Sequence, residues 1–306
     1  MMHKLAPELV AATLHYVDTL SLARLSHVNF SLRALCQAEL RNRIVREVGK
    51  HVKDPRRLLT MLGEAGGVVS GSTALAVALA GSAWDDVGGW QSMSDLDVYL
   101  PGEEHLLPLV TALCETEGYE AVDLPNKDDQ SYWEDQARIR SITRLRNSTY
   151  STHIDIICAW GGAATLTLPA FWGTIVMNFI TNTALVVSYP GLTFEGRGFV
   201  NDGVQRDRTE RNRRKYESRG FTVGAYKHDD EACSSDHTYC PSLLRYTEDA
   251  QSMKMIWNDE GARRKYHANS PALRGTEFTT TPSFWRWSHC EKITGDHGGG
   301  YMVGRL

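Results

Sequence analysis

The amino-acid sequence predicts an α+β protein in which several strands form a core flanked by helices. Short alternating or continuous apolar segments, typical of strands, occur at residues 66–70, 94–100, 139–146 and 153–158. Segments with apolar residues three and four positions apart, typical of amphipathic helices, lie before and between these strands. The chain of 306 residues is long enough for one large domain, or two modest ones, with a hydrophobic core.

Bulk properties exclude little. The formal charge of −4 and the isoelectric point near 6.3 imply no general attraction to nucleic acid or to a membrane. The first ten residues, MMHKLAPELV, lack the apolar segment and cleavage site of a signal peptide. Six cysteines in a chain of this length predict reduced thiols rather than a disulfide framework, with Cys36, Cys114 and Cys158 among apolar neighbours. We therefore expect an intracellular protein, cytoplasmic or nuclear.

Residues 1–49 are predicted to form a small helical segment ahead of the core. Pro7 suits the first turn of a helix, and Asp18 to Ser21 is typical of a turn that caps the next one. The helical pattern rests on the apolar residues Leu9, Val10, Leu14, Val17, Leu22, Leu25, Val28, Leu32 and Leu35. One interpretation is a helical cap that packs on the core.

The other interpretation comes from a resemblance. The order Leu5-Ala6-Pro7-Glu8-Leu9-Val10, Leu14, Tyr16-Val17-Asp18, Leu22-Ala23-Arg24-Leu25-Ser26 and Leu32-Arg33-Ala34-Leu35 resembles an F-box. The resemblance implies that residues 5–35 dock to the small adaptor protein of a cullin-type ubiquitin ligase. This chain has Leu32 where an F-box usually carries a tryptophan. Both interpretations stay open.

After a basic linker at residues 50–62, the core begins near residue 63 with a strand, a turn and a helix. Residues 66–70 (GGVVS) are typical of a buried strand, Gly71 and Ser72 form the turn, and Thr73 to Ala80 is predicted to be helical. The first N–H groups of a helix have no partner within it, and its dipole is positive there. Gly71 and Ser72 therefore indicate a phosphate-binding turn.

The next strand, Ser94 to Leu100, carries two carboxylates on one face. Strict alternation places Asp95 and Asp97 on one side and Leu96 and Val98 on the other. Carboxylates held side by side repel each other, and a divalent cation with oxygen ligands, Mg²⁺ above all, relieves that repulsion. The plainer interpretation is a solvated face of an edge strand.

A helix at Glu103 to Gly118, a polar surface loop at Pro125 to Gln136 and two further strands complete this region. The strands are Ile139 to Arg146 and His153 to Cys158. The second strand places Asp155 and His153 on one face. We leave His153 out of the expected catalytic set, because a hydroxyl activated by a metal ion needs no side-chain base.

These elements together resemble the nucleotidyltransferase superfamily typified by polymerase β. The resemblance rests on Gly71-Ser72, on Asp95-x-Asp97 and on Asp155 of a later strand, in that order. Residues 172–180 and 188–194 also resemble a group of fungal proteins with this kind of core. The resemblance implies a mixed sheet with flanking helices over residues 63–200.

The resemblance also implies roles. Asp95 and Asp97 would bind two Mg²⁺ (or Mn²⁺) ions, Asp155 would hold the one that activates the attacking hydroxyl, and Gly71 and Ser72 would hold the triphosphate of an NTP. The product would be a nucleoside monophosphate joined to an acceptor hydroxyl. The family's usual spacing between the Gly-Ser turn and the first acid is shorter than here, and the surplus, residues 81–92, could cover or block the pocket. The rival expectation is a non-catalytic interaction protein whose core is degenerate.

The uncharged stretch from Ile156 to Phe194 is long enough to span a bilayer. Because Gly161, Gly162 and Pro169 interrupt it, we predict buried elements instead: a strand end, a helix at Phe171 to Ile180 and a strand at Ala184 to Tyr189.

Residues 201–306 form a C-terminal extension that begins with a helical stretch at 205–220. This stretch holds seven Arg or Lys residues against three acids, which suits either a solvated helix face, the preferred interpretation, or an RNA or nucleotide phosphate path.

The extension also contains residues of metal-ligand type, namely Cys233, His237, Cys240, His289 and Cys290. Their spacing fits a zinc site poorly, so buried thiols and surface histidines are the default. Trp285 and Trp287 predict an extended segment packed on the core, and residues 295–306 predict a loose glycine-rich tail.

Overall fold

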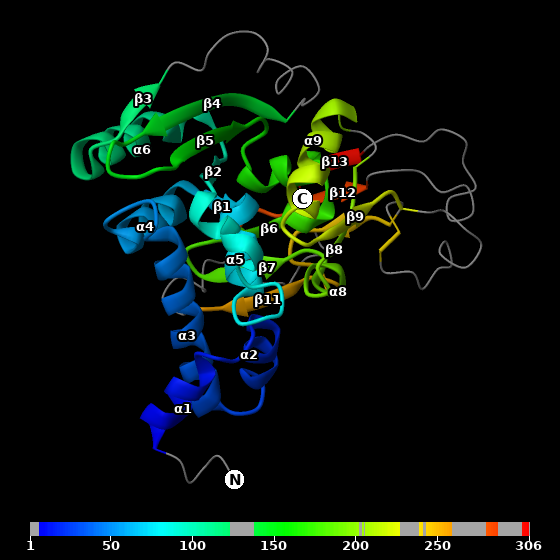
Figure 1. The fold of residues 1–306 in the computed structure, drawn as a ribbon. Coiled ribbons are helices and arrows are strands. Elements are labelled where there is room, and N and C mark those ends of the chain that lie inside the picture. The colour runs from blue at the N-terminus through cyan, green and yellow to red at the C-terminus, as the bar shows by residue number, and fades with distance from the viewer. Residues whose placement is uncertain are drawn as a thin grey trace.

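The computed structural model is organised around an eight-stranded sheet flanked by helices (Figure 1). The residues that it describes are 6–122, 138–201, 204, 206–226, 239–240, 243–258, 280–286 and 302–305. The strand order is β11-β7-β6-β1-β2-β5-β4-β3, in which β2 and β5 run parallel and the other neighbours antiparallel. The predicted α+β class, with a mixed sheet flanked by helices, is confirmed.

The strands of this sheet are β1 (Val68–Ser70), β2 (Leu96–Leu100), β3 (Glu120–Val122), β4 (Ile139–Arg146), β5 (His153–Ala159), β6 (Asn178–Ile180), β7 (Ala184–Val187) and β11 (Met253–Ile256). The α-helices are α1 (Pro7–Leu14), α2 (Thr19–Leu25), α3 (Phe30–Val48), α4 (Pro55–Ala65), α5 (Gly71–Leu79), α6 (Leu106–Ala112), α8 (Pro190–Thr193) and α9 (Arg206–Glu217). Shorter helical turns are η2 (Val87–Met93), η3 (Glu103–His105), η4 (Leu113–Glu117), η5 (Ala164–Ala170) and η6 (Thr174–Val176). A two-stranded sheet pairs β8 (Arg197–Phe199) with β9 (Thr222–Gly224). In a three-stranded sheet, β12 (Ser283–Arg286) lies between β10 (Arg245–Tyr246) and β13 (Met302–Arg305).

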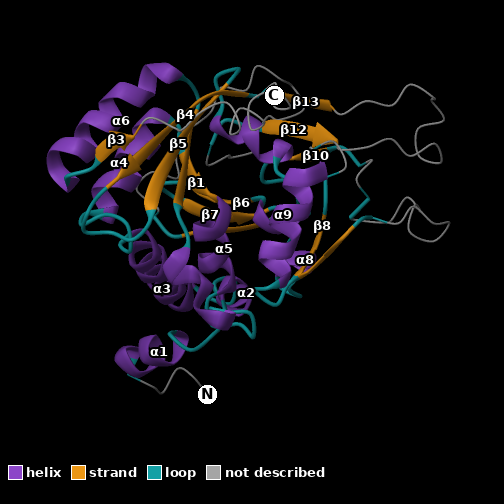
Figure 2. Ribbon diagram, turned by 45° about the horizontal axis from the view of Figure 1, so that its top comes forward, coloured by secondary structure: helices purple, strands orange, loops and turns teal. Residues whose placement is uncertain are grey.

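The sheet separates two hydrophobic clusters, because successive side chains of a strand point to opposite faces. On β2, Val98 belongs to the cluster shared with helices α1 to α4, whereas Tyr99 belongs to the cluster shared with η5, η6 and α9. On β5, Ile156 and Ile157 divide in the same way. Figure 2 shows the strands running through the middle of the helices, with α1 to α3 at one end of the molecule.

The N-terminal helices start where the sequence indicates. Pro7 occupies the first turn of α1, and Asp18 caps α2 by accepting a hydrogen bond from the Ser21 N–H at 2.8 Å. Asn29 caps α3 in the same way through the Leu32 N–H. Such caps satisfy N–H groups that have no partner inside the helix.

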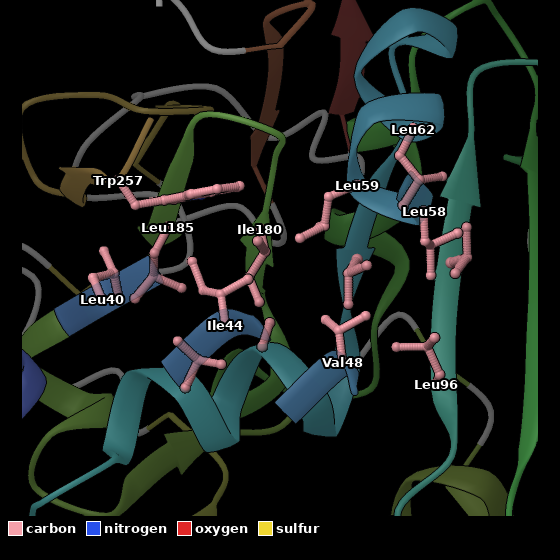
Figure 3. Packing of buried hydrophobic residues seen from close by; sticks show 14 of the residues in the cluster. Leu40, Ile44, Val48, Leu58, Leu59, Leu62, Leu96, Ile180, Leu185 and Trp257 are labelled. Carbon is pink, nitrogen blue, oxygen red and sulfur yellow. The ribbon is translucent and has the colours of Figure 1, made fainter. Parts of the chain in front are cut away.

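Helix α3 packs directly on the sheet. Its residues Leu40, Ile44 and Val48 are fully buried. Leu40 and Ile44 lie near Leu185 of β7 and Ile180 of β6 (Figure 3). The helical segment at the front of the chain therefore shares one core with the sheet.

Arg43, on the inward face of α3, ties the N-terminal helices together. Its side chain is 1% exposed, and its Nε donates to Glu39 Oε1 at 3.0 Å. Its terminal nitrogens donate to the backbone carbonyls of Leu14, Val17 and Ala80. A buried guanidinium is tolerated only when it is paired and its N–H groups are satisfied, as here.

The predicted strands at 139–146 and 153–158 are confirmed as β4 and β5, and the basic stretch at 205–220 is confirmed as the helix α9. The predicted helix at Phe171 to Ile180 is wrong. That segment contains the short turn η6 and then strand β6, which lies between β1 and β7. A short, fully buried apolar run has no periodicity that distinguishes helix from strand, so its tertiary position decides.

The predicted loose tail is wrong at residues 302–305, which form β13 and pair with β12. Trp285 lies on β12 and is 2% exposed, as expected for an extended segment packed on the core. Several predictions lie outside the described residues: the loop at 125–136, Trp287, and the candidate zinc ligands other than Cys240, which is buried with a free thiol. None of the described helices is long and apolar enough to cross a membrane.

We predict that Arg43→Met lowers the free energy of unfolding by about 3–5 kcal/mol, because it leaves Glu39 buried without its guanidinium partner and removes the hydrogen bonds that Arg43 donates to four backbone carbonyls. Equilibrium urea denaturation measures this change. Arg46→Met, which removes a 48% exposed side chain from the same helix, is the control and should cost less than about 1 kcal/mol. Equal losses in the two variants would contradict the role given to Arg43.

Candidate functional site

The turn between β1 and α5 places Gly71 directly against Asp97. Gly71 has a φ of +65°, in the left-handed region that favours glycine. A β-carbon at this position would collide with the Asp97 carboxylate. Ser72 follows as a buried residue that hydrogen-bonds to Tyr216. The N-terminus of α5 thus meets the acidic strand closely, and the glycine allows that approach.

Two of the three predicted carboxylates are directly opposite each other in the sheet. Because β2 and β5 are parallel, Asp97 pairs in register with Asp155. Asp95 lies immediately before β2, and its side chain is 34% exposed. The structure therefore brings Asp95, Asp97 and Asp155 together, although they are far apart in the sequence.

The environment of Asp97 strongly perturbs its pKa. Burial, followed by the charges of Asp155 and Asp95, raises the pKa of the Asp97 carboxyl from 3.8 to about 8. Lys215 and Arg144 act in the opposite direction but do not cancel the effect. Within the described part of the chain, no residue donates a hydrogen bond to this carboxylate. The Asp97 carboxyl therefore lies beside two further negative charges that the two cations compensate only in part.

Asp155 differs, because Arg144 engages both of its oxygens. Arg144 pairs in register with Asp155 across β4 and β5. Its Nε donates to Oδ1 and its Nη2 to Oδ2, each at 2.7 Å. Two parallel bonds of this kind are the strongest arrangement for an arginine and a carboxylate. Arg144 is not among the site residues expected from the sequence. Alternation along the strand at 139–146 could have shown which face of the strand Arg144 occupies, but not that it pairs with Asp155.

His153 lies next to Asp95. Its Nδ1 is 3.1 Å from Asp95 Oδ1, and its backbone N–H donates to the same oxygen at 3.3 Å. Burial lowers the pKa of the His153 imidazole, while Asp95 and Asp155 partly counter this effect. His153 is thus a neighbour that orients Asp95.

Helix α9 forms the wall opposite the acids. Arg208, Asn212 and Lys215, spaced four and three residues apart, project from one face of the helix into the same pocket as the carboxylates. Burial, and then the nearby Arg219, lowers the pKa of the Lys215 ammonium, and Asp97 and Asp95 oppose this shift. One face of this basic helix therefore lines the cavity, whereas the preferred interpretation of the sequence was a wholly solvated helix. The spacing of residues 208, 212 and 215 in the sequence predicts that they share one helix face, but it does not predict that this face points towards the acids.

These residues enclose a cavity of about 220 Å³ that is charged at one end and apolar at the other. Strand register explains the division. The row Asp97–Asp155–Arg144 lies next to the row Tyr99–Ile157–Ile142, two residues along each strand. The other lining residues are Gly71, Ser72, Asp95, Ile139, Phe171, Trp172, Val176, Arg208, Asn212, Lys215 and Tyr216.

The long segment between Ser72 and Asp95 does not enter this cavity. Among the described residues that line it, none comes from 81–92. Trp84 stacks on Phe221 with ring centroids 5.9 Å apart, and the Arg219 guanidinium lies 4.8 Å from the ring centres of both Trp90 and Tyr216. The segment packs beside α9 instead.

The donor set fits a divalent cation at Asp95 and Asp97 better than at Asp155. Asp97 is an unsatisfied carboxylate with a second one two residues away, which is the chemistry a hard cation satisfies. Asp155 already has a cation, the guanidinium of Arg144. In the described residues, no group of three His, Cys, Asp or Glu side chains is arranged to hold a metal ion.

Comparison with known proteins adds nothing to this geometry, because no family model, curated protein or solved structure matches the chain.

We predict that, in metal-free buffer, the melting temperature falls as the pH rises from about 5 to about 8. The native state keeps a proton on Asp97 up to about pH 8, whereas the unfolded carboxyl loses it near 3.8, so the unfolded state binds fewer protons between these values. Thermal denaturation of the wild type and of Asp97→Asn, measured against pH, tests this. The variant should show a shallower fall, and parallel curves for the two proteins would exclude Asp97 as the source.

Proposed function

We propose that the pocket binds a nucleoside triphosphate and a divalent cation, and transfers the nucleoside monophosphate to an acceptor hydroxyl. A nucleotidyltransferase-like fold for residues 63–200 is part of this proposal. The observation that carries it is the polarity of one cavity, in which carboxylates, cations and a helix N-terminus meet at one end and apolar side chains line the other. A nucleotide has the same polarity.

The triphosphate is assigned to the charged end. Gly71 and Ser72 present the N-terminus of α5, where backbone N–H groups and the helix dipole favour an anion. Lys215 faces this end from α9, and Arg208 of the same helix lines the same cavity. The Lys215 ammonium interacts with both Asp97 and Asp95, which places a positive charge at this end of the cavity.

The base is assigned to the apolar end. Ile142 and Ile157 form one side, and Phe171 and Trp172 belong to the hydrophobic cluster on the same face of the sheet. Flat aromatic and branched aliphatic side chains contact a base without reading its edges. This end therefore supports nucleotide binding with little base preference.

Asp95 and Asp97 would hold Mg²⁺ or Mn²⁺, which supplies Lewis-acid stabilisation of the phosphates when it is bound. In the transfer, the acceptor oxygen forms a bond to the α-phosphorus, and the bond between the α- and β-phosphates breaks. Pyrophosphate leaves with the electron pair, and the hydroxyl proton passes to solvent. Lys215 and Arg208 then neutralise charge on the leaving group.

We predict that Lys215→Ala weakens binding of a fluorescent ATP analogue roughly tenfold or more, because it removes the cation that lines the cavity beside Asp97 and Asp95. Arg214→Ala is the matched control, since Arg214 is the preceding residue, is 75% exposed and pairs with Glu210. Fluorescence titration of each NTP with Mg²⁺ or Mn²⁺ measures the affinity. Comparable losses in both variants would point to general charge rather than to the pocket.

Transfer itself is tested by incubating the protein with each labelled NTP, a divalent cation and mixed protein or RNA acceptors. We expect label on an acceptor with the wild type and none with Asp97→Asn, which should keep a cooperative thermal transition. Absence of both nucleotide binding and transfer would overturn the proposed function.

A second function, as an adaptor, is favoured by one observation at the N-terminal helices. Four large apolar residues are strongly exposed there: Leu9 is 58% exposed, Tyr16 82%, Val28 64% and Phe30 82%. An F-box-like segment that docks to the small adaptor of a cullin-type ligase would use such a surface. The two functions involve different parts of the molecule and do not exclude each other.

We predict that the pair Leu9→Ala and Phe30→Ala abolishes co-purification with such a ligase adaptor, since it removes exposed apolar area without touching the core. Leu107→Ala, which truncates a 73% exposed leucine on α6, is the control. Affinity purification of the whole chain mixed with the purified adaptor provides the measurement. No complex with the wild type would remove this second candidate.

A further inference from the structure

The register of strands β4 and β5 fixes the position of Arg144 opposite Asp155. These two strands are antiparallel, and Asp155 in turn lies directly opposite Asp97 in the parallel pair β5 and β2. Residues opposite one another in neighbouring strands share a face of the sheet. Asp97, Asp155 and Arg144 therefore lie side by side on three neighbouring strands, with the positive charge of Arg144 next to Asp155.

We propose that the Arg144 guanidinium takes the place of a divalent cation at Asp155, so that the pocket binds one ion, on Asp95 and Asp97, and not two. This inference rests on the proposed function, because it concerns the ions that accompany the nucleotide.

The contact between Arg144 and Asp155 occupies both carboxylate oxygens, as a bound cation would. Both Asp155 oxygens accept from Arg144 at 2.7 Å. The Arg144 side chain is 26% exposed and the Asp155 side chain is 15% exposed. A guanidinium stays charged at every physiological pH and matches a carboxylate with two parallel bonds. An ion approaching Asp155 would have to break both bonds and then lie beside the displaced positive charge, which repels it.

Asp95 and Asp97 remain available. The bonds from His153 reach only one oxygen of Asp95, Oδ1. Asp97 receives charge from Lys215 and Arg144 through space, but no described residue donates a hydrogen bond to it. Two carboxylates two residues apart on one face supply oxygen ligands for one cation, with the remaining positions left for water and phosphate oxygens.

The consequence concerns the acceptor. In a pocket with two ions, the second ion lowers the pKa of the attacking hydroxyl. With Arg144 at that position, the hydroxyl meets a fixed guanidinium, which stabilises negative charge but binds no oxygen as a ligand. We therefore expect nucleotide binding that depends on one ion, and transfer that is slow relative to binding.

The experiment counts Mn²⁺ ions bound per whole chain, by electron paramagnetic resonance of free Mn²⁺, in the presence of saturating non-hydrolysable ATP analogue. We expect one ion in the wild type, still one ion in Asp155→Asn, and two in Arg144→Gln. Arg140→Gln is the matched control, because Arg140 lies on the same strand and pairs with Glu103 instead. It should bind one ion.

The outcomes separate this inference from the proposed function. Two ions in the wild type, one of them lost in Asp155→Asn, would overturn the inference and leave the proposed function in place. Nucleotide binding without any Mn²⁺ would overturn the inference and also the metal-binding part of the proposed function, while leaving nucleotide binding in place. Binding of neither nucleotide nor Mn²⁺ would overturn both. If Arg144→Gln fails to show a cooperative melting transition, the wild type and Asp155→Asn decide the question by themselves.

Discussion

The pairing of β2 with β5 is the constraint on which the rest of the pocket depends. Parallel register sets Asp97 beside Asp155, and two carboxylates at that separation, partly withdrawn from water, destabilise the fold unless positive charge compensates them. The surrounding structure supplies that charge from both sides, as Arg144 on the neighbouring strand and Lys215 on α9. Gly71 lets the N-terminus of α5 come close as well. The same charges make the cavity suited to a polyanion accompanied by a cation.

The N-terminal helices have two different faces, and this matters for both proposed functions. The inward face of α3 packs on β6 and β7, so these helices are part of the structure that holds the sheet in place. Arg43 joins them to the end of α5 through the carbonyl of Ala80, and α5 begins at Gly71, beside the cavity. The outward face carries the exposed apolar residues. A partner docked there would contact the same helical layer that supports one wall of the pocket.

Local signals in the sequence were sufficient for the elements with clear periodicity or caps. Strands β4 and β5, the helix α9, the cap at Asp18 and the first-turn proline Pro7 follow from side-chain chemistry within a few residues. The three acids could be placed on strands, but not next to Arg144, because that contact depends on the register of β4 against β5. Strand β6 was mistaken for a helix because a uniformly buried segment takes its form from its neighbours. Nor does periodicity reveal that α9 turns Lys215 towards the acids.

The segment at 81–92 acts as a brace. The Arg219 guanidinium lies against the rings of both Trp90 and Tyr216, and Trp84 stacks on Phe221, so this segment is attached to the end of α9 and to the residues that follow it. Tyr216 is the neighbour of Lys215 and lies beside Ser72. Shortening residues 81–92 would therefore loosen the helix that carries Lys215. The width of the cavity thus depends in part on residues that do not line it.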